Sequence, residues 1–426
     1  MTIGHSDDKF SESVFDLLSL SVAAHADRAS EGSLHIVLVA PPYFDVPPSG
    51  YGGVEAVVAS LADELVDRGH RVTLLGAGRA GTKARFISLW DECQTARLGE
   101  PYPEIVHAMK AWQVIEQLHR EDPVDIVHDH TFAGPLNAAG YRMLGIPAVV
   151  TVHGPVDPEM CDYYRSFDRN MKLVAISDRQ RALAPNLNWI GRVHNAINPD
   201  EWPFRTEKLD YALFLGRYAP YKGPDLALRA AHEAGIRLIL AGKCNEPPEK
   251  KYFAEHVRPL LTPADDVFGE ADATAKRQLL AGAQCLLFPI SWEEPFGIVM
   301  LEAMVCGTPV VALRGGAVSE VVEHGVTGFI CDHPDELPEA IARASELDPY
   351  ACRERVERLF ATGNFAAGYD AVYRQAVKAG IPAAPRREGT RRPTVPARRP
   401  LAPRPPAIVR ETPGAHTVET TVGTAG

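Results

Sequence analysis

The sequence has no long hydrophobic run. Its apolar stretch near the N-terminus, residues 15–24 (FDLLSLSVAA), follows two aspartates, contains a third, and is too short to span a bilayer. We therefore expect no signal peptide and no integral membrane segment. The seven cysteines are scattered, with no closely spaced pair of the zinc-binding or redox type. Reduced thiols fit a cytoplasmic protein, and this is the location that we predict.

Positive charge is not in excess either. The 426 residues carry a formal net charge of −11, which gives no reason to expect binding to nucleic acid or to an anionic membrane. No HExxH motif and no Ser-His-Asp arrangement is visible, and His128 and His130 lack the third ligand that a zinc site needs. We therefore predict no metal and no cofactor, and any anionic ligand must be held by local groups.

Strands and helices alternate in two series along the chain, and its length suits two domains. Helical periodicity is clearest from Val54 to Leu65, before Gly69. Alternation of this kind predicts an α/β fold with two doubly wound domains, each a parallel sheet covered by helices on both faces. The apolar runs that we predict as strands are residues 34–40, 71–76, 124–130, 148–154 and 173–177, then 211–216, 237–242, 285–290 and 308–313.

The domain organisation follows from these series. We expect an N-terminal extension at residues 1–32, a first domain at 33–200, a second domain at 205–362 and a tail at 381–426. The tail has many prolines, and its eight arginines and three glutamates give +5, so residues 1–380 carry −16. It is predicted to be disordered because it cannot bury enough apolar surface. Its charge suits either contact with an acidic partner or an inert solvated tail.

Three glycines precede the first periodic helix: Gly50, Gly52 and Gly53. Free backbone N–H groups and the positive end of the helix dipole would face an anion there. The alternative is a plain tight turn, since glycine also serves any position with positive φ.

Two cations follow the first strand of the second series. Arg217 comes directly after residues 211–216, and Lys222 precedes a helix predicted from Pro224. Open α/β sheets bind ligands at this carboxyl edge, where a diphosphate would suit a guanidinium and an ammonium together. The alternative is a pair of solvated surface charges.

Two carboxylates flank the start of another helix. Glu294 lies in the loop after residues 285–290, and Glu302 lies about one turn into the helix that we predict from Ile298. They can accept hydrogen bonds from sugar hydroxyls while the first amides of the helix bind phosphate oxygens. A solvated helix face is the alternative, and Glu293 is expected to be solvated.

Together these motifs resemble the family-4 retaining glycosyltransferases over residues 34–378. The resemblance implies the GT-B fold, in which two Rossmann-like domains face a deep cleft, with a closing helix at 363–380 that crosses back to the first domain. The motifs occur in the family's order: GGVE (52–55), TVHG (151–154), HNAIN (194–198), GRYAPYKG (216–223), EEPFGIVMLEAM (293–304), GTPVVA (307–312) and GGAVSEVVEHGVTGF (315–329).

The resemblance also implies roles for single residues. Arg217 and Lys222 would hold the donor diphosphate, Glu294 the hydroxyls of the transferred sugar, and Glu302 the ribose. The implied catalytic residues are His153, Arg217, Lys222 and Glu294. The implied donor-binding residues are Gly52, Gly53, Arg217, Lys222, Glu294, Phe296, Gly297, Ile298 and Glu302. His128, His130 and Asn195 are assigned to the acceptor pocket or cleft, with plain packing as the alternative for the two histidines.

The function implied is a hexosyltransferase of carbohydrate biosynthesis, which moves a sugar with retention from a nucleoside-diphosphate sugar to an unidentified acceptor. No well-placed carboxylate nucleophile is evident in the first domain, so a metal-independent front-face mechanism is expected. An alternative is a sugar-nucleotide epimerase, because the same fold hosts one.

Overall fold

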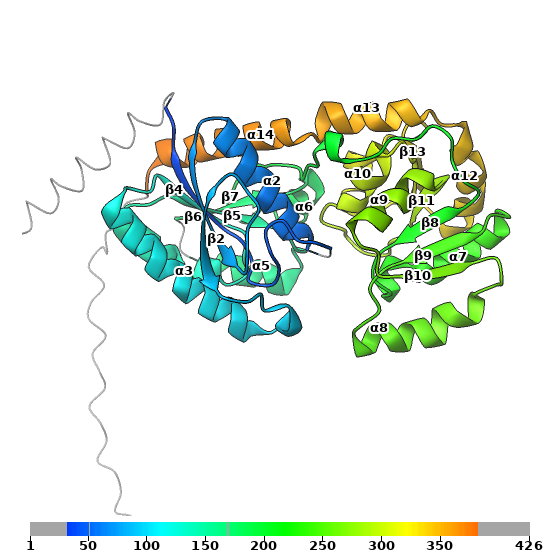
Figure 1. The fold of residues 1–426 in the computed structure, drawn as a ribbon, viewed down its shortest axis with the longest axis horizontal. Coiled ribbons are helices and arrows are strands. Elements are labelled where there is room, and N and C mark those ends of the chain that lie inside the picture. Colours follow the sequence, from blue (N-terminus) through cyan, green and yellow to red (C-terminus); the bar gives the residue numbers. More distant parts are fainter. Residues whose placement is uncertain (1–31, 51, 168–169, 382–426) are drawn as a thin grey trace, which may run out of the picture. The chain divides into compact units, whose positions relative to one another are not determined.

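The computed structural model describes residues 32–50, 52–167 and 170–381. The predictions of an N-terminal extension at 1–32 and a disordered tail at 381–426 therefore fall, apart from Gly32 and Ile381, outside the described residues. The described part contains two separate sheets (Figure 1), in which every strand pairing is parallel. The predicted class, α/β with doubly wound sheets, is confirmed.

The first sheet has seven strands in the order β3-β2-β1-β4-β5-β6-β7. They are β1 (His35–Val39), β2 (Arg71–Ala77), β3 (Arg85–Trp90), β4 (Ile126–Asp129), β5 (Ala148–Val152), β6 (Met171–Ala175) and β7 (Trp189–Arg192).

The second sheet has six strands in the order β10-β9-β8-β11-β12-β13. They are β8 (Ala212–Leu215), β9 (Leu238–Ala241), β10 (Asp266–Gly269), β11 (Cys285–Phe288), β12 (Val310–Leu313) and β13 (Gly328–Cys331).

Helices cover both faces of each sheet. Successive side chains of a strand point to opposite faces, and in these buried parallel strands both sets are apolar and need to be covered. On β1, for example, Ile36 packs in the cluster with α2 and α14, whereas Val37 packs in the cluster with α3 and α4. None of the helices in the described ranges is long and apolar enough to cross a membrane. The helices are α2 (Gly53–Asp67), α3 (Pro101–Glu121), α4 (Ala138–Leu144), α5 (Pro158–Arg165), α6 (Asp178–Leu183), α7 (Pro224–Glu233), α8 (Pro247–Tyr252), α9 (Ala273–Gly282), α10 (Ile298–Val305), α11 (Val318–Val321), α12 (Leu337–Arg343), α13 (Pro349–Leu359) and α14 (Thr362–Ala379).

Each sheet reverses its strand order once. The reversal lies between β1 and β4 in the first sheet and between β8 and β11 in the second. Ligands of open α/β sheets bind outside the carboxyl ends of the strands at such a reversal. The glycine-rich loop follows β1, Arg217 follows β8, and the loop with Glu294 follows β11. The sequence motifs thus lie at the two places where this topology favours a ligand.

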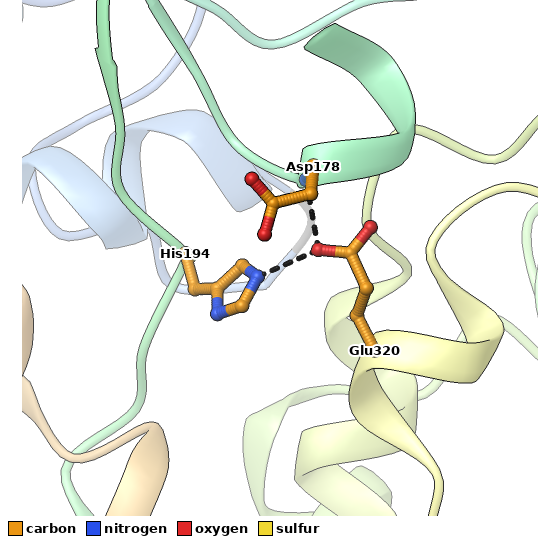
Figure 2. Close-up of side chains that lie close together, drawn as sticks. All are labelled: Asp178, His194 and Glu320. Carbon is orange, nitrogen blue, oxygen red and sulfur yellow. Dashed lines mark hydrogen bonds and ion pairs between the residues drawn. The ribbon is translucent and has the colours of Figure 1, made fainter. Parts of the chain in front are cut away.

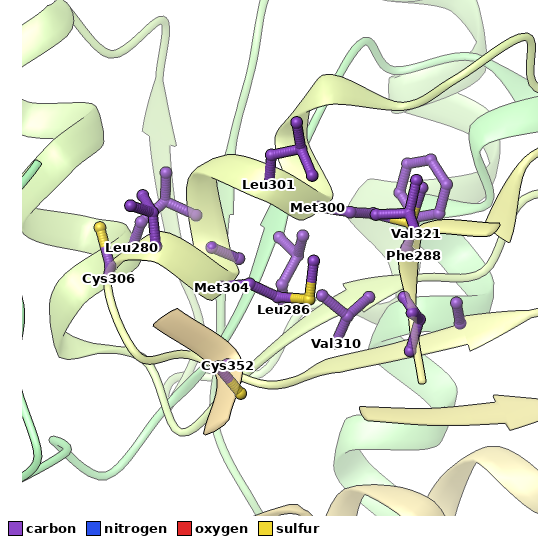
Figure 3. Packing of buried hydrophobic residues seen from close by; sticks show 14 of the residues in the cluster. Leu280, Leu286, Phe288, Met300, Leu301, Met304, Cys306, Val310, Val321 and Cys352 are labelled. Atoms are coloured by element: carbon purple, nitrogen blue, oxygen red, sulfur yellow. The ribbon is translucent and has the colours of Figure 1, made fainter. Parts of the chain in front are cut away.

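Helix α10 is apolar on nearly all sides and packs on the second sheet. Figure 3 shows Met304 of α10 beside Leu286 of β11 and Val310 of β12, and Met300 of α10 beside Phe288 of β11, all of them buried. A helix that is apolar on all sides is normally buried. Glu302 is the one carboxylate in α10, and it is buried with the rest of the helix, with only 7% of its surface exposed. A carboxylate in such surroundings requires a partner.

Helix α14 packs against the first sheet although it follows the second sheet in sequence. Its residues Tyr369 and Tyr373 are fully buried in the cluster that contains α2 and β1. The backbone N–H of Ile197 donates to the carbonyl of Phe360 at 3.1 Å, just before α14 begins. The first sheet's core is therefore completed by the last helix of the described chain.

Candidate active site

Lys222 and Glu294 form an ion pair at the edge of the second sheet. The Lys222 Nζ lies 2.5 Å from the Glu294 Oε2, and the Trp292 indole N–H donates to the same oxygen at 3.0 Å. The ammonium also lies 4.9 Å from the centre of the Trp292 ring, within the range of a cation–π contact. Because both charged side chains are mostly buried, this pair is a fixed polar feature rather than two solvated charges.

Arg217 is held by carboxylates that the sequence did not point to. Its Nε lies 2.6 Å from Glu249 Oε1, and its terminal Nη2 lies 2.8 Å from Glu246 Oε2. Glu249 also accepts hydrogen bonds from the backbone N–H groups of Asn245 and Glu246. These bonds orient the guanidinium at the carboxyl end of β8.

Glu302 has its partner in Lys276 of α9, whose Nζ lies 2.6 Å from Glu302 Oε1. Sequence reasoning missed this lysine, because nothing in the helical pattern of α9 distinguishes it from a solvated one. Both residues line a cavity of about 260 Å³. Its lining brings together Gly52, Gly53, Arg217, Lys276, Ile298 and Glu302, five of which were predicted as donor-binding residues.

Two glycines at helix starts have backbone conformations that other residues rarely adopt. Gly52 precedes α2 with φ 139°, and Gly297 precedes α10 with φ 78°. A Cβ on Gly297 would lie 2.8 Å from Met300 Cε, so the position also lacks space. Phe296, one residue earlier, is buried against His194 and Phe360, which leaves its backbone rather than its ring for a ligand.

His153 follows β5 and pairs with His130, which follows β4. The His130 Nδ1 lies 2.9 Å from the His153 Nε2, so one ring donates to the other. Burial lowers the pKa of His153 to about 4 and lowers the pKa of His130 well below its usual range. The two rings are therefore neutral at physiological pH. Within the described chain, His130 Nε2 has no hydrogen-bond partner.

His128 has different hydrogen-bond partners from His130 and His153. It is fully buried, with Nδ1 bonded to the Tyr373 hydroxyl at 2.7 Å and Nε2 bonded to the Thr151 hydroxyl at 2.8 Å. Of the two alternatives for this residue, the structure therefore favours packing. Asn195 is also buried, and its Oδ1 has no partner among the described residues.

Three buried carboxyls near the first sheet's edge were not predicted. Burial raises the pKa of Asp129 to about 7 and the pKa of Glu55 to about 7, and it also raises the pKa of Glu104. Asp129 accepts from the N–H and hydroxyl of Thr131, while Glu104 accepts from the N–H of Phe132. Each lies in or beside a polar loop or helix start, where a sequence pattern cannot distinguish burial from exposure.

Asp178, His194 and Glu320 also lie close together (Figure 2), with one ligand atom of each within 4.8 Å of the others. Glu320 already accepts from the His194 ring and from the Asp178 backbone N–H, and Asp178 pairs with Arg192 at 3.1 Å. Since the carboxylates are occupied by these donors, we interpret the group as a structural contact.

Comparisons with known proteins agree with this geometry. Residues 51–195 match the family described as Glycosyltransferase Family 4, and residues 199–358 match Glycosyl transferases group 1. Glycogen synthase of Mycobacterium tuberculosis is 31% identical over 367 residues, which are 74% of this chain and 87% of that protein. Phosphatidyl-myo-inositol mannosyltransferase of Mycobacterium leprae is 26% identical over 356 residues, 76% of this chain and 90% of that one.

Among solved structures, a glycosyltransferase involved in avilamycin A biosynthesis superimposes with a TM-score of 0.62 at 28% identity, covering 81% of this chain and 98% of that one. The chain therefore belongs to the family-4 glycosyltransferases, and it has the GT-B fold. It is accordingly a glycosyltransferase enzyme, which confirms the resemblance seen in the motifs.

Proposed function

We propose that the protein transfers a sugar, with retention of configuration, from a nucleoside-diphosphate sugar to an acceptor. The observation that supports this most is the second sheet's edge beside the start of α10, where Lys222 pairs with Glu294 and Lys276 pairs with Glu302. Arg217 lines the same cavity as Lys276 and Glu302. Cations and helix amides suit a diphosphate, and carboxylates suit sugar hydroxyls. In this proposal residues 33–200 hold the acceptor, residues 205–362 hold the donor, and residues 363–380 join back to the first part.

The proposed mechanism is front-face transfer. The bond from the sugar's anomeric carbon to the diphosphate oxygen breaks, and the acceptor oxygen bonds to that carbon on the same face. The departing phosphate oxygen takes the acceptor's proton, while Arg217 and Lys222 stabilise the developing charge. The buried carboxyls Glu104 and Asp129 already accept hydrogen bonds from the backbone N–H groups of Phe132 and Thr131, which fits a route without a covalent carboxylate intermediate.

The acceptor side differs in charge. Around the ends of β4 and β5, His130 and His153 are neutral and burial favours the neutral forms of Glu104 and Asp129, so these four residues offer an anion no cationic partner. We therefore propose an acceptor without an anionic group. Matched acceptors, one sugar alcohol and its phosphate ester, would test this, and turnover of the ester alone would contradict it.

Two further parts of the proposal concern the conditions of the reaction. We propose that no bound divalent metal is needed, because cations and helix amides already face the diphosphate. Turnover should persist in EDTA. A loss of turnover that magnesium or manganese restores would contradict this part of the proposal.

A cytoplasmic location is proposed from the reduced, scattered cysteines.

The donor proposal is tested by a thermal-shift panel of nucleoside diphosphates and nucleotide sugars. A ligand at 100 times its dissociation constant adds about 2.7 kcal/mol of stability. The matching donor should then release free nucleotide when an acceptor is supplied. The absence of any stabilising nucleotide would contradict the proposal.

A further inference from the structure

Helix α6 begins beside His153 and is tied to it through Gln180. The Gln180 amide N–H group donates at 2.8 Å to the carbonyl of Val152 and at 2.8 Å to that of Gly154. These are the carbonyls of the two residues that flank His153. Gln180 is itself buried, and its Oε1 accepts from the backbone N–H of Ile176 at 2.9 Å. The first turn of α6 therefore fixes the backbone that carries His153.

The preceding residue, Arg179, reaches the loop that carries Glu294. Its Nε and Nη2 donate to the two oxygens of Glu293 at 2.9 and 2.5 Å, a bidentate pair. Glu293 also accepts from the backbone N–H of Gly316 at 3.1 Å. Glu293 is exposed, as expected, but its carboxylate also accepts these three hydrogen bonds.

Glu320 makes a second contact with the same turn of α6. Its carboxylate accepts from the backbone N–H groups of Asp178 and Arg179 and from His194 Nε2, each at 2.8 Å, and Figure 2 shows its approach to Asp178 and His194. Burial alone would raise the pKa of Glu320, but these hydrogen bonds outweigh it and lower that pKa. The group is thus a carboxylate at the start of α6.

The segment between these two glutamates supports Glu294 directly. The backbone N–H of Ala317 donates to the Glu294 carbonyl at 3.0 Å. Gly316 has φ 49°, and a Cβ there would lie 2.0 Å from the Glu294 carbonyl oxygen. Residues 316–320 and the Glu294 loop are therefore packed directly against each other, and Glu293 and Glu320 connect them to α6.

We infer that Arg179 is a positioning residue for the glycosyl transfer: with Gln180 beside it, it couples the backbone of His153 to the loop of Glu294. Arg179 and Gln180 are neighbours in sequence. Gln180 bonds the backbone at the end of β5 in the first sheet, whereas Arg179 bonds Glu293 in the loop that follows β11 of the second sheet. Arg179 does not touch the reacting atoms. It sets the placement of Glu294 relative to His153, and this inference rests on the proposed function.

The expected effect is on turnover rather than on folding. Arg179 and Glu293 have side chains that are 47% and 44% exposed, and exposed ion pairs contribute little to stability. Misplacing a catalytic group by about 1 Å can cost a hundredfold in rate. Nucleotide binding should change little, because Arg217, Lys276 and Glu302 lie outside the contact.

The test compares four proteins in steady-state kinetics with a saturating acceptor: wild type, Arg179→Glu, Glu293→Arg and the double variant that exchanges the two charges. Each single variant should lose about 10- to 100-fold in kcat. The double variant should regain most of that loss, and the affinity for the nucleoside diphosphate, measured by calorimetry, should stay within about threefold throughout.

Arg71 and Asp122 provide the matched control, since they form an ion pair at 2.5 Å with side chains 54% and 48% exposed at the opposite edge of the first sheet. Arg71→Glu should leave kcat unchanged.

Wild-type turnover in Arg179→Glu, or a double variant no better than the weaker single variant, would overturn the inference. A folding defect shows as a lowered thermal midpoint, and Arg179→Gln then gives the same test with a smaller change. Inactive wild type with every donor would instead refute the proposed function.

Discussion

The carboxyl edges of the two sheets differ in charge around the points where their strand order reverses. The edge of the second sheet carries Arg217 and Lys222, each paired with a carboxylate. Near the edge of the first sheet lie the neutral histidines His130 and His153 and the buried acid Asp129, whose pKa is raised to about 7. The two sheets share a topology, so the difference lies in the loops rather than in the fold.

In the proposed function, this difference lets one architecture, used twice, bind two substrates of different chemistry. Arg217 and Lys222 on the second edge are cations that can also bind the oxygens of a phosphate. In the same proposal, the neutral histidines His130 and His153 on the first edge suit an uncharged acceptor hydroxyl. Under the proposed function the donor binds at the second edge and the acceptor at the first, and each prediction below changes one edge.

The largest effect is expected from removing helix α14, which packs against the first sheet. Ending the chain after Thr362 deletes most of α14, including Tyr373, which bonds His128, and Tyr369, whose hydroxyl lies 2.7 Å from Thr151 Oγ1. Several buried aromatic residues would then leave a cavity, and each such loss costs about 3 to 5 kcal/mol. We expect no folded, active protein, as judged by circular dichroism and turnover.

A chain that ends after Gly380 is the control for this truncation. It keeps all of α14, and we expect turnover close to that of the full chain. Equal behaviour of the two truncated chains would contradict the importance of α14 for the first edge.

The second prediction removes the charge of Glu294 on the second edge. Glu294→Gln keeps the size of the side chain but weakens its bonds to sugar hydroxyls and to Lys222. We expect kcat to fall by roughly a hundredfold, because an interaction that strengthens in the transition state is lost. Nucleotide affinity, measured by calorimetry, should be nearly unchanged. Normal turnover would mean that Glu294 is a structural partner of Lys222 only.

The inner strands were predictable from the sequence, whereas the four outer strands were not. Inner strands such as β1 and β11 are buried throughout and show as continuous apolar runs. The outer strands β3, β7 and β10 are largely exposed or half-buried, so their residues lack both a run and a clean alternation. The remaining outer strand, β13, is buried, but it is only four residues long and begins with glycine.

The site residues that lie within a short, continuous sequence motif could be predicted from the sequence. Lys222 and Glu294 stand in short, recognisable stretches, and the structure brings them together. Their supporting partners come from distant parts of the chain: Arg179 and Glu293, for example, are 114 residues apart. No local pattern marks such a pair, because it exists only once the two sheets have folded.

The third prediction separates Glu302 from Glu294. Glu302→Gln should weaken binding of the nucleoside diphosphate by about 1.5 to 3 kcal/mol, the usual range for a hydrogen bond to a charged group. That corresponds to roughly a 10- to 150-fold change in the dissociation constant. Calorimetric titration measures it, with Glu294→Gln as the matched control. Unchanged binding would mean that Glu302 serves only to pair with Lys276.

The smallest effect is expected from Asp129→Asn on the first edge. Asp129 is fully buried, and its Oδ2 has no hydrogen-bond partner in the described chain. Its pKa of about 7 lies above the ordinary value of 3.8, so the folded protein prefers the protonated form. The resulting stability is fully present below about pH 4 and is lost as the pH rises to about 7. Asparagine stays neutral and keeps an oxygen for Thr131.

We therefore expect the thermal midpoint of wild type to fall relative to that of Asp129→Asn as the pH is raised from about 4 to about 7, and the gap to stay constant above that range. Glu104, whose charge helps to raise the pKa of Asp129, is present in both proteins, so the difference between the two melting curves reports on the removal of the Asp129 carboxyl. Thermal denaturation at a series of pH values measures it. A gap that does not change with pH would mean that Asp129 is ionised in the folded protein, and the first edge would then be as charged as the second.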